Sequence, residues 1–461
     1  MRQRILVIGG LAAGPAAASK AKRTNRDAEV ILFEQGEHIS SGICEVPYYI
    51  GNVIPDVEKL SPLTPLNFER TRGVKVHTLH RVEEIQPVKK YIVVRDLYHD
   101  KIVQHEYDKL ILATGSKTKS IGMAGEHARN VFHVKSLSDG LDIKHFIDEE
   151  KPKCAVIIGG GYVAMEMCEA LRTIGLETIL LHRNELPMSK LEPDARNSIL
   201  AELKKNSVQV HSNQTLKEFK TDNTGKVFEI VTNTGRYPAD VVILAIGIEP
   251  NVDLAKSIRT RLGSFGGILT DQHQSTSVDS IYAAGDCCEV KNLVNNRWMY
   301  APLATYAARQ GWVSGENSAG GNAVFKGALR AIAVKLFGLE IAAIGINSME
   351  AEESGFSPIV ERITGDSKIS FYPGSEKIQI IAIADRKTHR LIGANVVGGS
   401  GSALRANILG VAIQQKMTVE ELSKLDLLYS PPFAPLWDPI LIAANQLKKR
   451  MGAPNNIFLG T

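Results

Sequence analysis

Two stretches decide the fold of this chain: RILVIGGLAAGPAAASKAKR (residues 4–23) and CAVIIGGGYVAMEMCEALRTIG (residues 154–175). Each begins with an apolar run rich in β-branched residues, turns at glycines and continues into an alanine-rich stretch. A second apolar run follows each of them, EVILFE (29–34) and ETILLHR (177–183). This order of strand, glycine turn, helix and strand is the βαβ unit that binds a dinucleotide. The sequence therefore predicts an α/β chain with two dinucleotide-binding units.

The glycines of both turns have a steric purpose. The pyrophosphate of a dinucleotide lies on the helix N-terminus, where free N–H groups and the helix dipole face it. Glycine allows the tight turn and the close approach of the backbone. Gly9 and Gly14 hold the outer positions of the first unit, where Leu11 replaces the middle glycine, and Gly159 and Gly161 hold the first two positions of the second. A glycine turn before a buried helix is common, but two complete units favour nucleotide binding over a purely structural role.

The residues at the ends of the second strands indicate which dinucleotide each unit binds. Glu34 can accept both hydroxyls of an adenosine ribose, as an unphosphorylated dinucleotide requires. His182 and Arg183 stand at the equivalent end of the second unit. No carboxylate there repels a 2′-phosphate, and Arg183 can pair with one. We therefore expect NADPH on the second unit, with NADH as the alternative if Arg183 only faces solvent.

Three further apolar runs end in small residues: YDKLILATGS (107–116), DVVILAIGIEPN (240–251) and SIYAAGDCCEV (280–290). The last of them places Asp286 at a strand end, where a carboxylate suits a polyol such as the ribityl chain of a flavin. A helix start made of small residues follows, APLATYAARQG (301–311), where a ring system can lie close to the backbone. These features favour FAD on the first unit.

In this order the segments resemble the pyridine nucleotide–disulfide oxidoreductases, a superfamily of flavoproteins with two dinucleotide-binding domains. The resemblance spans essentially the whole chain. It implies an α/β fold with two Rossmann-like domains, one for FAD and one for NAD(P), and a C-terminal α+β dimerisation domain. The implied boundaries are residues 1–117 and 248–325 for the FAD domain, 118–247 for the NAD(P) domain and 326–461 for the dimerisation domain.

The same resemblance implies the residues that hold the cofactors. Those expected around FAD are Gly9, Gly10, Ala13, Gly14, Glu34, Gln35, Val82, Ala113, Thr114, Gly115, Asp286, Pro302, Leu303 and Ala304. Those expected around NADPH or NADH are Gly159, Gly161, Tyr162, Val163, Glu166, His182, Arg183 and Gly247. Tyr162 is the expected gate over the flavin ring.

One cysteine stands out from the five in the chain. Cys44 lies in HISSGICEVPYYIGN (38–52), just before Pro47, a residue favoured in the first turn of a helix. A helix N-terminus stabilises the thiolate, the form that attacks disulfides. The alternative, a cysteine that only packs as a small hydrophobe, is normally favoured, but the position between two nucleotide sites argues against it. Glu45 acts against the thiolate, since a nearby carboxylate raises the pKa of a thiol.

Comparison with the branches of this superfamily indicates which redox reaction Cys44 can carry out. Enzymes similar to glutathione reductase pair two cysteines at a CxxxxC spacing, but Tyr49 occupies the fifth position after Cys44. SGICEVPYYIG therefore looks like the single-cysteine branch, which holds coenzyme A-disulfide reductases, NADH oxidases and peroxidases, and reductases of persulfides or polysulfides. Members that reduce oxygen or peroxide carry a histidine in the first glycine turn, and GGLAAG has none. Ile43 stands where these reductases often carry an asparagine, which weakens the resemblance to enzymes that act on coenzyme A itself.

The coenzyme A-disulfide reductases also use tyrosines from the C-terminal domain of the partner subunit as proton donors. DLLYSPPFAPLWDP (426–439) matches that motif, and Tyr429 is the residue carried over. A phenol can donate a proton to a departing thiolate. SFYPG (370–374) resembles the segment that supplies a second tyrosine, with Phe371 and Tyr372 as alternative matches. The alternative for Tyr429 is a purely structural role, as a buried tyrosine in a proline-rich turn.

Coenzyme A disulfide is the first substrate expected from this resemblance. Lys20 and Arg23 can meet its phosphates, and Ser40 and Ser41 can line its thiol arm, although each of the four can equally be ordinary surface. Reduction of polysulfide, persulfide or sulfur at the same thiol is the second hypothesis, and a flavin NADH oxidase the third. The fourth hypothesis is not an enzymatic one: a flavoprotein whose redox state controls the binding of a partner protein.

Composition limits the remaining possibilities. The chain has 461 residues with 54 basic and 50 acidic ones, a balance too even for a nucleic-acid or anionic-membrane partner. No apolar run reaches the roughly 18 residues of a membrane helix, and the N-terminus does not read as a secretory signal, so we expect a cytoplasmic homodimer. None of the five cysteines forms a CxxC pair or a zinc spacing, so no metal site is expected.

Overall fold

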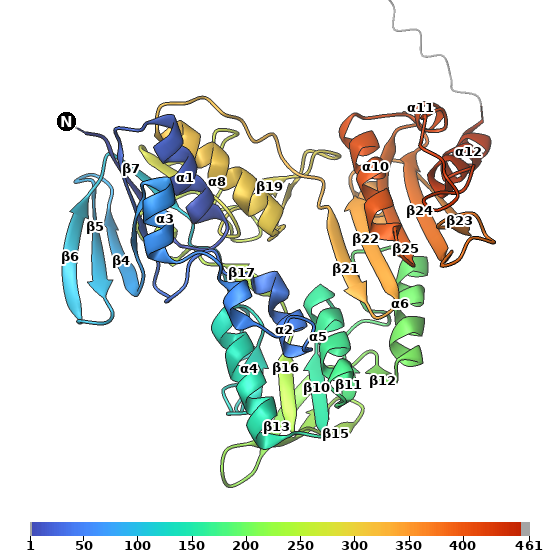
Figure 1. The fold of residues 1–461 in the computed structure, drawn as a ribbon, viewed down its shortest axis with the longest axis horizontal. Helices are drawn as coiled ribbons and strands as arrows, with labels where there is room; N and C mark the ends of the chain where they lie inside the picture. Colours follow the sequence, from blue (N-terminus) through green and yellow to red (C-terminus); the bar gives the residue numbers. More distant parts are fainter. Residues whose placement is uncertain (1, 453–461) are drawn as a thin grey trace, which may run out of the picture.

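The first parallel sheet is built around the strand that precedes the first glycine turn. The computed structural model describes residues 2–452, which form three lobes (Figure 1). Strand β1 (Arg4–Ile8) is buried on both faces, as a central parallel strand must be. Its five-stranded sheet has the order β18-β7-β1-β2-β3. The other strands are β18 (Ile281–Ala283), β7 (Lys109–Leu112), β2 (Glu29–Phe33) and β3 (Lys75–His77).

Helices and a small sheet complete this lobe. Helices α1 (Ala13–Thr24) and α8 (Ala304–Ser318) pack against each other, although almost 300 residues separate them. The other helices are η1 (Ile43–Glu45), α2 (Val46–Ile50), η2 (Val57–Leu60), α3 (Pro65–Arg72) and α7 (Asp253–Ser257). The antiparallel strands are β4 (His80–Gln86), β5 (Tyr91–Asp96) and β6 (Lys101–Glu106), with a separate pair, β19 (Val290–Lys291) and β20 (Trp298–Met299).

A second parallel sheet repeats the arrangement around the second glycine turn. Its order is β12-β11-β10-β16-β9. The strands are β9 (Val131–His133), β10 (Cys154–Ile158), β11 (Glu177–Leu181), β12 (Val208–His211) and β16 (Val241–Leu244). The helices are α4 (Leu137–Glu150), α5 (Tyr162–Thr173) and α6 (Pro193–Lys205). A small antiparallel sheet adds β13 (Leu216–Thr221), β14 (Val227–Thr232) and β15 (Arg236–Pro238).

The chain passes between the two parallel sheets through one antiparallel pair. Strand β8 (Ser116–Thr118) pairs with β17 (Ile248–Pro250). The boundaries expected at residues 117 and 248 lie in this pair, and their exact positions stay a prediction. The predicted α/β architecture is confirmed.

The third lobe is α+β. Its five-stranded antiparallel sheet has the order β21-β22-β25-β24-β23. The strands are β21 (Ile332–Leu336), β22 (Leu339–Gly345), β23 (Pro358–Asp366), β24 (Lys377–Asp385) and β25 (Leu391–Gly398). The helices are α9 (Ser348–Glu353), α10 (Ser402–Gln414), α11 (Val419–Leu422) and α12 (Pro439–Met451). Both faces of β25 are buried, because α10 covers one and the second lobe covers part of the other.

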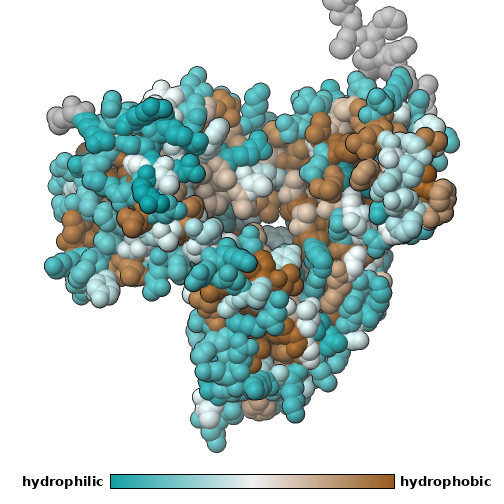
Figure 2. Space-filling model, viewed as in Figure 1, coloured by the Kyte–Doolittle hydropathy of each residue, from teal (hydrophilic) through white to brown (hydrophobic). Residues whose placement is uncertain are grey.

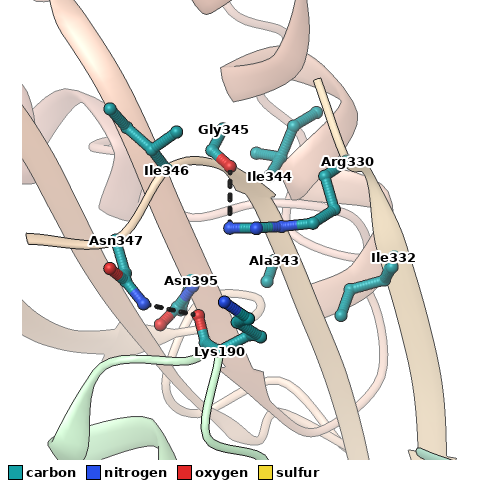
Figure 3. A pocket seen from close by; sticks show the side chains of 9 residues that line it. All are labelled: Lys190, Arg330, Ile332, Ala343, Ile344, Gly345, Ile346, Asn347 and Asn395. Carbon is teal, nitrogen blue, oxygen red and sulfur yellow. Dashed lines mark hydrogen bonds between the residues drawn. The ribbon is translucent and has the colours of Figure 1, made fainter. Parts of the chain in front are cut away.

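The second and third lobes share one hydrophobic core. Val334, Leu336 and Ile341 of the third lobe belong to the same buried cluster as Leu171 and Leu203 of the second. Polar contacts close the rim of this junction (Figure 3). There the Asn347 side-chain amide donates to the carbonyl of Lys190 at 3.2 Å, and the backbone N–H of Glu192 donates to Asn395 at 2.7 Å. The cavity in this rim measures about 10 Å³, room for a single water molecule, so it is not a substrate site.

The surface of the third lobe carries many exposed apolar side chains. Figure 2 shows apolar side chains gathered over this lobe. Its exposed large hydrophobic residues include Phe371, Leu404, Val411, Leu428, Phe433, Leu436 and Trp437. Such a surface is typical of a protein–protein interface.

Within residues 2–452, none of the helices combines the length and the apolar character that crossing a bilayer requires.

Candidate active site

The first glycine turn has no space for side chains. Gly9 has a φ of +110°, and a Cβ there would lie 2.1 Å from the carbonyl oxygen of Ala113. A Cβ on Gly14 would lie 1.8 Å from the carbonyl oxygen of Gly9. Strand, turn and helix α1 therefore close tightly, and the N-terminus of α1 is left free to receive a pyrophosphate. Ala13 lies in the same turn and is buried.

Glu34 is held in place at the end of β2. The backbone N–H of Gly10 donates to its Oε2 at 2.6 Å, and that of Gly36 donates to its Oε1 at 2.7 Å. Each oxygen keeps a further lone pair for a ribose hydroxyl. Gln35, which follows it, is exposed, and Val82 of β4 is buried nearby on the same domain.

Asp286 follows β18 and faces the space between the two parallel sheets. The Ser116 hydroxyl donates to its Oδ2 at 3.0 Å, and the Nζ of Lys135 lies 3.8 Å from the same oxygen. The Thr114 hydroxyl donates to the carbonyl of Asn251 at 2.6 Å. Gly115 has a φ of +67° with open space where a Cβ would point. A glycine turn without Cβ atoms, a fixed Glu34 and a positioned Asp286 fit FAD.

Helix α8 begins beside this site. Pro302 and Leu303 are half-buried, and Ala304, the first residue of α8, is exposed. These small and apolar residues leave the start of the helix accessible. Cys287 and Cys288, by contrast, are fully packed, with their sulfur atoms 3.8 Å apart. Both are free thiols, as are the other three cysteines.

The second glycine turn repeats the steric pattern. Gly159 has a φ of +140°, and a Cβ there would lie 2.1 Å from the carbonyl oxygen of Ala245. Gly161 is the N-cap of α5 and has open space around it, as does Gly247, which follows β16. Tyr162 and Val163 form the first turn of α5 and are half-buried. This open helix end fits the pyrophosphate of NAD(P)H.

His182 and Arg183 differ in their surroundings. His182 is buried, its Nδ1 has no hydrogen-bond partner within the described chain, and its Nε2 lies 3.3 Å from the Ser212 hydroxyl. Burial lowers the pKa of His182, so the ring is neutral at pH 7. Arg183 is exposed at the end of β11 and is free to meet a phosphate.

Cys44 lies in the short helix η1, directly before α2. Its thiol is accessible to solvent, but its pKa is raised. Partial burial is the largest cause, followed by the negative charges of Glu45, Glu166 and Asp286, while Lys135 opposes them. The expected lowering of the thiol pKa by the helix N-terminus is therefore not found, because burial and then the nearby carboxylates raise the pKa of Cys44, and α2 has only five residues.

These charges show that Cys44 lies where the two nucleotide domains meet. Glu166 belongs to α5 of the second lobe, whereas Asp286 follows β18 of the first. Burial, with a smaller contribution from Glu169, raises the pKa of Glu166 to about 7. Tyr162, one turn before Glu166, is within electrostatic range of Cys44 and Asp286. Cys44, Tyr162 and Asp286 therefore lie close enough to affect one another electrostatically.

A cleft of about 470 Å³ adjoins the segment that leads to Cys44. Three of the four predicted substrate residues, Arg23, Ser40 and Ser41, line it. Lys20 does not line it, because its Nζ pairs with Glu316 at 2.7 Å. The other residues of the lining are Leu11, Ala12, Pro15, Ala16, Ser19, Leu63, Phe68, Arg72, Ala308 and Trp312.

Trp312 and Arg72 were not predicted from the sequence. The Nζ of Lys20 lies 4.4 Å from the centre of the Trp312 ring, and the guanidinium carbon of Arg23 lies 5.6 Å from it. An aromatic ring among basic side chains suits a phosphorylated, ring-bearing ligand. Lys135 was missed as well, since no motif marks a single lysine between a strand and a helix.

The predicted tyrosines lie on the third lobe. Tyr429 lies between α11 and α12 and is 47% exposed. Phe371 is 84% exposed, whereas Tyr372 is half-buried, with the Nζ of Lys368 5.8 Å from its ring centre. Figure 1 shows α11 and α12 well apart from α2, so within one chain Tyr429 does not reach Cys44.

Fold and site together define an FAD-dependent NAD(P)H oxidoreductase with one accessible thiol. Residues 3–311 match the family model described as pyridine nucleotide-disulphide oxidoreductase, and residues 332–439 match the dimerisation domain of that family. The chain belongs to this family, and the resemblance seen in the sequence is confirmed.

Several named proteins are similar to this chain over most of their length. The chain is 34% identical to the NAD(P)H coenzyme A polysulfide/persulfide reductase of Pyrococcus horikoshii, over 97% of this chain and 99% of the relative. It is 28% identical to the coenzyme A disulfide reductase of Staphylococcus haemolyticus, over 94% of this chain and 96% of the relative. The crystal structure of reduced CoADR-RHD from Bacillus anthracis superposes with a TM-score of 0.94 at 29% identity, covering 98% of this chain and 81% of that one.

Proposed function

We propose that this protein is an NADPH-dependent coenzyme A-disulfide reductase that works through Cys44. The observation that carries the proposal is the cleft next to the segment that leads to Cys44, whose lining includes Arg23, Arg72 and Trp312. A disulfide of two bare thiols needs no such cleft, but a disulfide with a nucleotide at its far end does. The relatives named for coenzyme A disulfide and coenzyme A persulfide support the same chemistry.

The reaction begins at the sulfur of Cys44. Its thiolate attacks one sulfur of coenzyme A disulfide, which breaks the S–S bond, forms a mixed disulfide with Cys44 and releases one coenzyme A thiolate. We assign the proton for that thiolate to Tyr429 of the partner subunit, with Tyr372 as the second candidate. When bound, FAD supplies the two-electron transfer from NADPH that returns the mixed disulfide to the Cys44 thiolate and a second coenzyme A. The sum is one disulfide, one NADPH and one proton converted to two thiols and NADP⁺.

The chain supplies position and charge for this chemistry. When FAD is bound, Glu34 would hold its adenosine ribose and Asp286 its ribityl chain, and Arg183 would select the 2′-phosphate of NADPH, with NADH as the weaker alternative. Lys135 partly offsets the carboxylates around the thiol. Because the pKa of Cys44 is raised, the rate of the attack is expected to increase with pH through the neutral range.

The partner subunit completes the site in this proposal. The family dimerisation domain and the apolar surface of the third lobe support a homodimer. We propose that dimer formation covers this surface and brings each Tyr429 to the Cys44 of the other chain. A cytoplasmic location stays a prediction from the sequence.

The second candidate function is reduction of polysulfide or persulfide at the same thiol. The Pyrococcus horikoshii relative carries that activity in its name. Steady-state rates of the FAD-loaded dimer on coenzyme A disulfide and on inorganic polysulfide separate the two functions. Cys44→Ser should abolish turnover with both acceptors, and NADPH consumption with disulfides that survives this change would refute the thiol mechanism.

Trp312→Ala provides the matched test of the cleft. We expect the KM for coenzyme A disulfide to rise about tenfold, as loss of one aromatic stacking contact of roughly 1–3 kcal/mol predicts, with the rate on polysulfide unchanged. Equal effects on both acceptors would show that the cleft does not bind the nucleotide. Trp298→Phe, which changes a tryptophan outside the cleft, serves as the control.

A further inference from the structure

The two segments that carry Tyr429 and Tyr372 meet at one buried arginine. Arg405, near the start of α10, is only 8% exposed. Its Nε donates to Oδ2 of Asp438 at 2.9 Å, and its Nη2 donates to the backbone carbonyl of Ser367 at 2.9 Å. Asp438 is the last residue of the segment that carries Tyr429, and Ser367 is the first of the segment that carries Tyr372. One guanidinium group therefore joins the bases of both segments.

The Tyr372 loop, residues 367–376, is closed at its base by two hydrogen bonds. The Ser367 N–H donates to the Glu376 carbonyl at 2.8 Å, and the Glu376 N–H donates to the Ser367 hydroxyl at 3.0 Å. Oε2 of Glu376 also accepts the backbone N–H of Ser400, just before α10, at 2.8 Å. Ser367 is 2% exposed, whereas Phe371 near the tip of the loop is 84% exposed. The base of this loop is therefore a fixed part of the lobe.

The Tyr429 loop, residues 423–438, is fixed at its C-terminal end. Asp438 is the N-cap of α12, where its Oδ1 accepts the backbone N–H of Ile440 at 2.9 Å, and its other oxygen accepts the guanidinium. A second contact is independent of this ion pair. A Cβ on Gly365, at the end of β23, would lie 2.7 Å from Cγ of Pro439, the first residue of α12. The bases of the two loops therefore lie against each other.

Between its fixed ends the Tyr429 loop presents its tyrosine on the surface. Leu425 and Leu427 pack on the core of the third lobe. The Ala434 N–H donates to the Ser430 carbonyl at 3.0 Å, which forms a turn directly after the tyrosine. Tyr429 is 47% exposed between these two anchors. Its position therefore depends on how the ends of the loop are held.

An arginine is suited to hold the loops in one arrangement. A buried ion pair contributes little net stability compared with well-packed apolar residues, because desolvation of the charges offsets their attraction. The planar guanidinium has N–H groups in fixed directions, so it accepts its partners in one arrangement only. Apolar side chains of similar volume would join the loops without specifying that arrangement. Arg405 therefore determines the relative position of the loops more than the stability of the lobe.

We propose that Arg405 is a positioning residue for Tyr429, the proton donor of the proposed function. By holding Asp438 against the base of the Tyr372 loop, Arg405 fixes the Tyr429 loop on the apolar surface of the third lobe. In the reaction the O–H bond of Tyr429 breaks as the S–H bond of coenzyme A forms, and the phenolate regains a proton from solvent. A displaced phenol delivers this proton more slowly. The inference rests on the proposed function, because it requires Tyr429 at the Cys44 of the partner subunit.

The test compares two acceptors that differ in the thiolate they release. Coenzyme A disulfide releases an alkyl thiolate, which at pH 7 needs a proton because the pKa of an alkyl thiol lies near about 8.5. The mixed disulfide of coenzyme A with 5-thio-2-nitrobenzoate releases a coloured aryl thiolate, which departs without a proton. Attack by Cys44 gives the same coenzyme A adduct in both cases. Single-turnover rates of the NADPH-reduced, FAD-loaded dimer are measured with each acceptor.

Arg405→Lys keeps a charge beside Asp438 but loses the planar group that also reaches Ser367. We expect it to slow the reaction of coenzyme A disulfide about tenfold, part of the roughly 10²–10⁴-fold that a general acid contributes, and to change the reaction of the mixed disulfide by less than about twofold. Tyr429→Phe should show the same difference between the acceptors. Arg405→Lys should add nothing in the Tyr429→Phe background, because both changes act on one proton transfer.

A second variant and a control separate positioning from a folding defect. Asp438→Asn keeps an N-cap oxygen but not the charge, and it should show the same difference between the acceptors. Arg330→Lys is the matched control, because Arg330 of the same lobe pairs with Glu350 in the rim shared with the second lobe. It should slow neither acceptor.

Equal slowing of both acceptors by Arg405→Lys, or a further loss when it is added to Tyr429→Phe, would overturn the inference. A clear difference between the acceptors in Tyr429→Phe without one in Arg405→Lys would overturn this inference alone. Turnover that survives in Cys44→Ser would instead overturn the proposed function, and this inference with it.

Discussion

At the residue scale, we expect single side chains at the ends of strands to determine which cofactor each unit binds. Arg183 is exposed at the end of β11, beside the open N-terminus of α5. A guanidinium pairs with a phosphate by charge-assisted hydrogen bonds, each of which contributes about 1.5–3 kcal/mol. The predicted preference for NADPH therefore depends on this one side chain.

We predict that Arg183→Ala raises the KM for NADPH about tenfold or more, because a charge-assisted contact is lost, and leaves the KM for NADH unchanged. Steady-state kinetics with both nucleotides at saturating coenzyme A disulfide measure the effect. Asn184→Ala, at the next exposed position, is the control. A parallel loss with NADH would mean that Arg183 supports the fold and not the phosphate.

At the scale of elements, the contact between α1 and α8 holds the flavin turn. A Cβ on Gly315 would lie 2.1 Å from the carbonyl oxygen of Ala17, and one on Gly311 would lie 2.3 Å from that of Ala13. The two helices touch through backbone atoms, so neither can shift without the other. Because α1 begins at the pyrophosphate turn, this contact determines the position of the turn.

We predict that Gly315→Ala destabilises the protein by roughly 1–3 kcal/mol, the usual cost of overpacking, despite the gain in helix propensity. The thermal unfolding midpoint should fall, and the purified protein should retain less FAD by its visible absorbance. Thr305→Ala, at an exposed position of the same helix, should change neither. A Gly315→Ala protein with full FAD and an unchanged midpoint would contradict the packing argument.

The small sheet beside the first lobe introduces a pH dependence of stability. His77 and His105 lie near each other, with ring centres 6.4 Å apart. Burial, and then the neighbouring histidines, lower the pKa of both rings below 6.5. The unfolded chain therefore binds more protons than the folded one, so stability is present above pH 6.5 and is lost as the pH falls below that value.

We predict a lower thermal unfolding midpoint at pH 5.5 than at pH 7.5, and a smaller difference for His105→Gln. Carboxylates such as Glu29, whose pKa is lowered from 4.5 by Lys75 and Arg4, lose their contribution only at more acidic pH. His133 and His182 also have lowered pKa values, so the variant should reduce the difference without removing it. An identical difference in the variant and the wild type would refute the assignment.

At the scale of the whole molecule, the proposed active site combines residues of two chains. Cys44 lies between the first and second lobes, whereas Tyr429 lies on the exposed apolar surface of the third. In a symmetric dimer each site takes its thiol from one chain and its tyrosine from the other.

Subunit mixing tests this arrangement. Homodimers of Cys44→Ser and of Tyr429→Phe should both be slow. Exchange between them should restore about a quarter of the wild-type rate, because half of the dimers are hybrids and each hybrid holds one intact site of two. No gain on mixing, with exchange verified by mass spectrometry of the intact dimers, would place Tyr429 outside the site.

The sequence alone determined the features that follow from local steric rules. A tight turn between a buried strand and a helix requires glycine in any protein, so the glycine pattern predicted both nucleotide units. The ends of the neighbouring strands then identified Glu34 and Asp286. The motif around Cys44 identified the thiol, and the absence of a cysteine at position 49 excluded an internal disulfide.

Only the tertiary structure decided what surrounds that thiol. The cleft with Trp312 and Arg72 and the approach of Lys135 to Asp286 each join segments of the chain that lie far apart. No local periodicity records such contacts, because they depend on how whole domains pack. For the same reason the pKa of Cys44 is raised, first by burial and then by the negative charges of Glu45, Glu166 and Asp286, and is not lowered as its place before α2 had suggested.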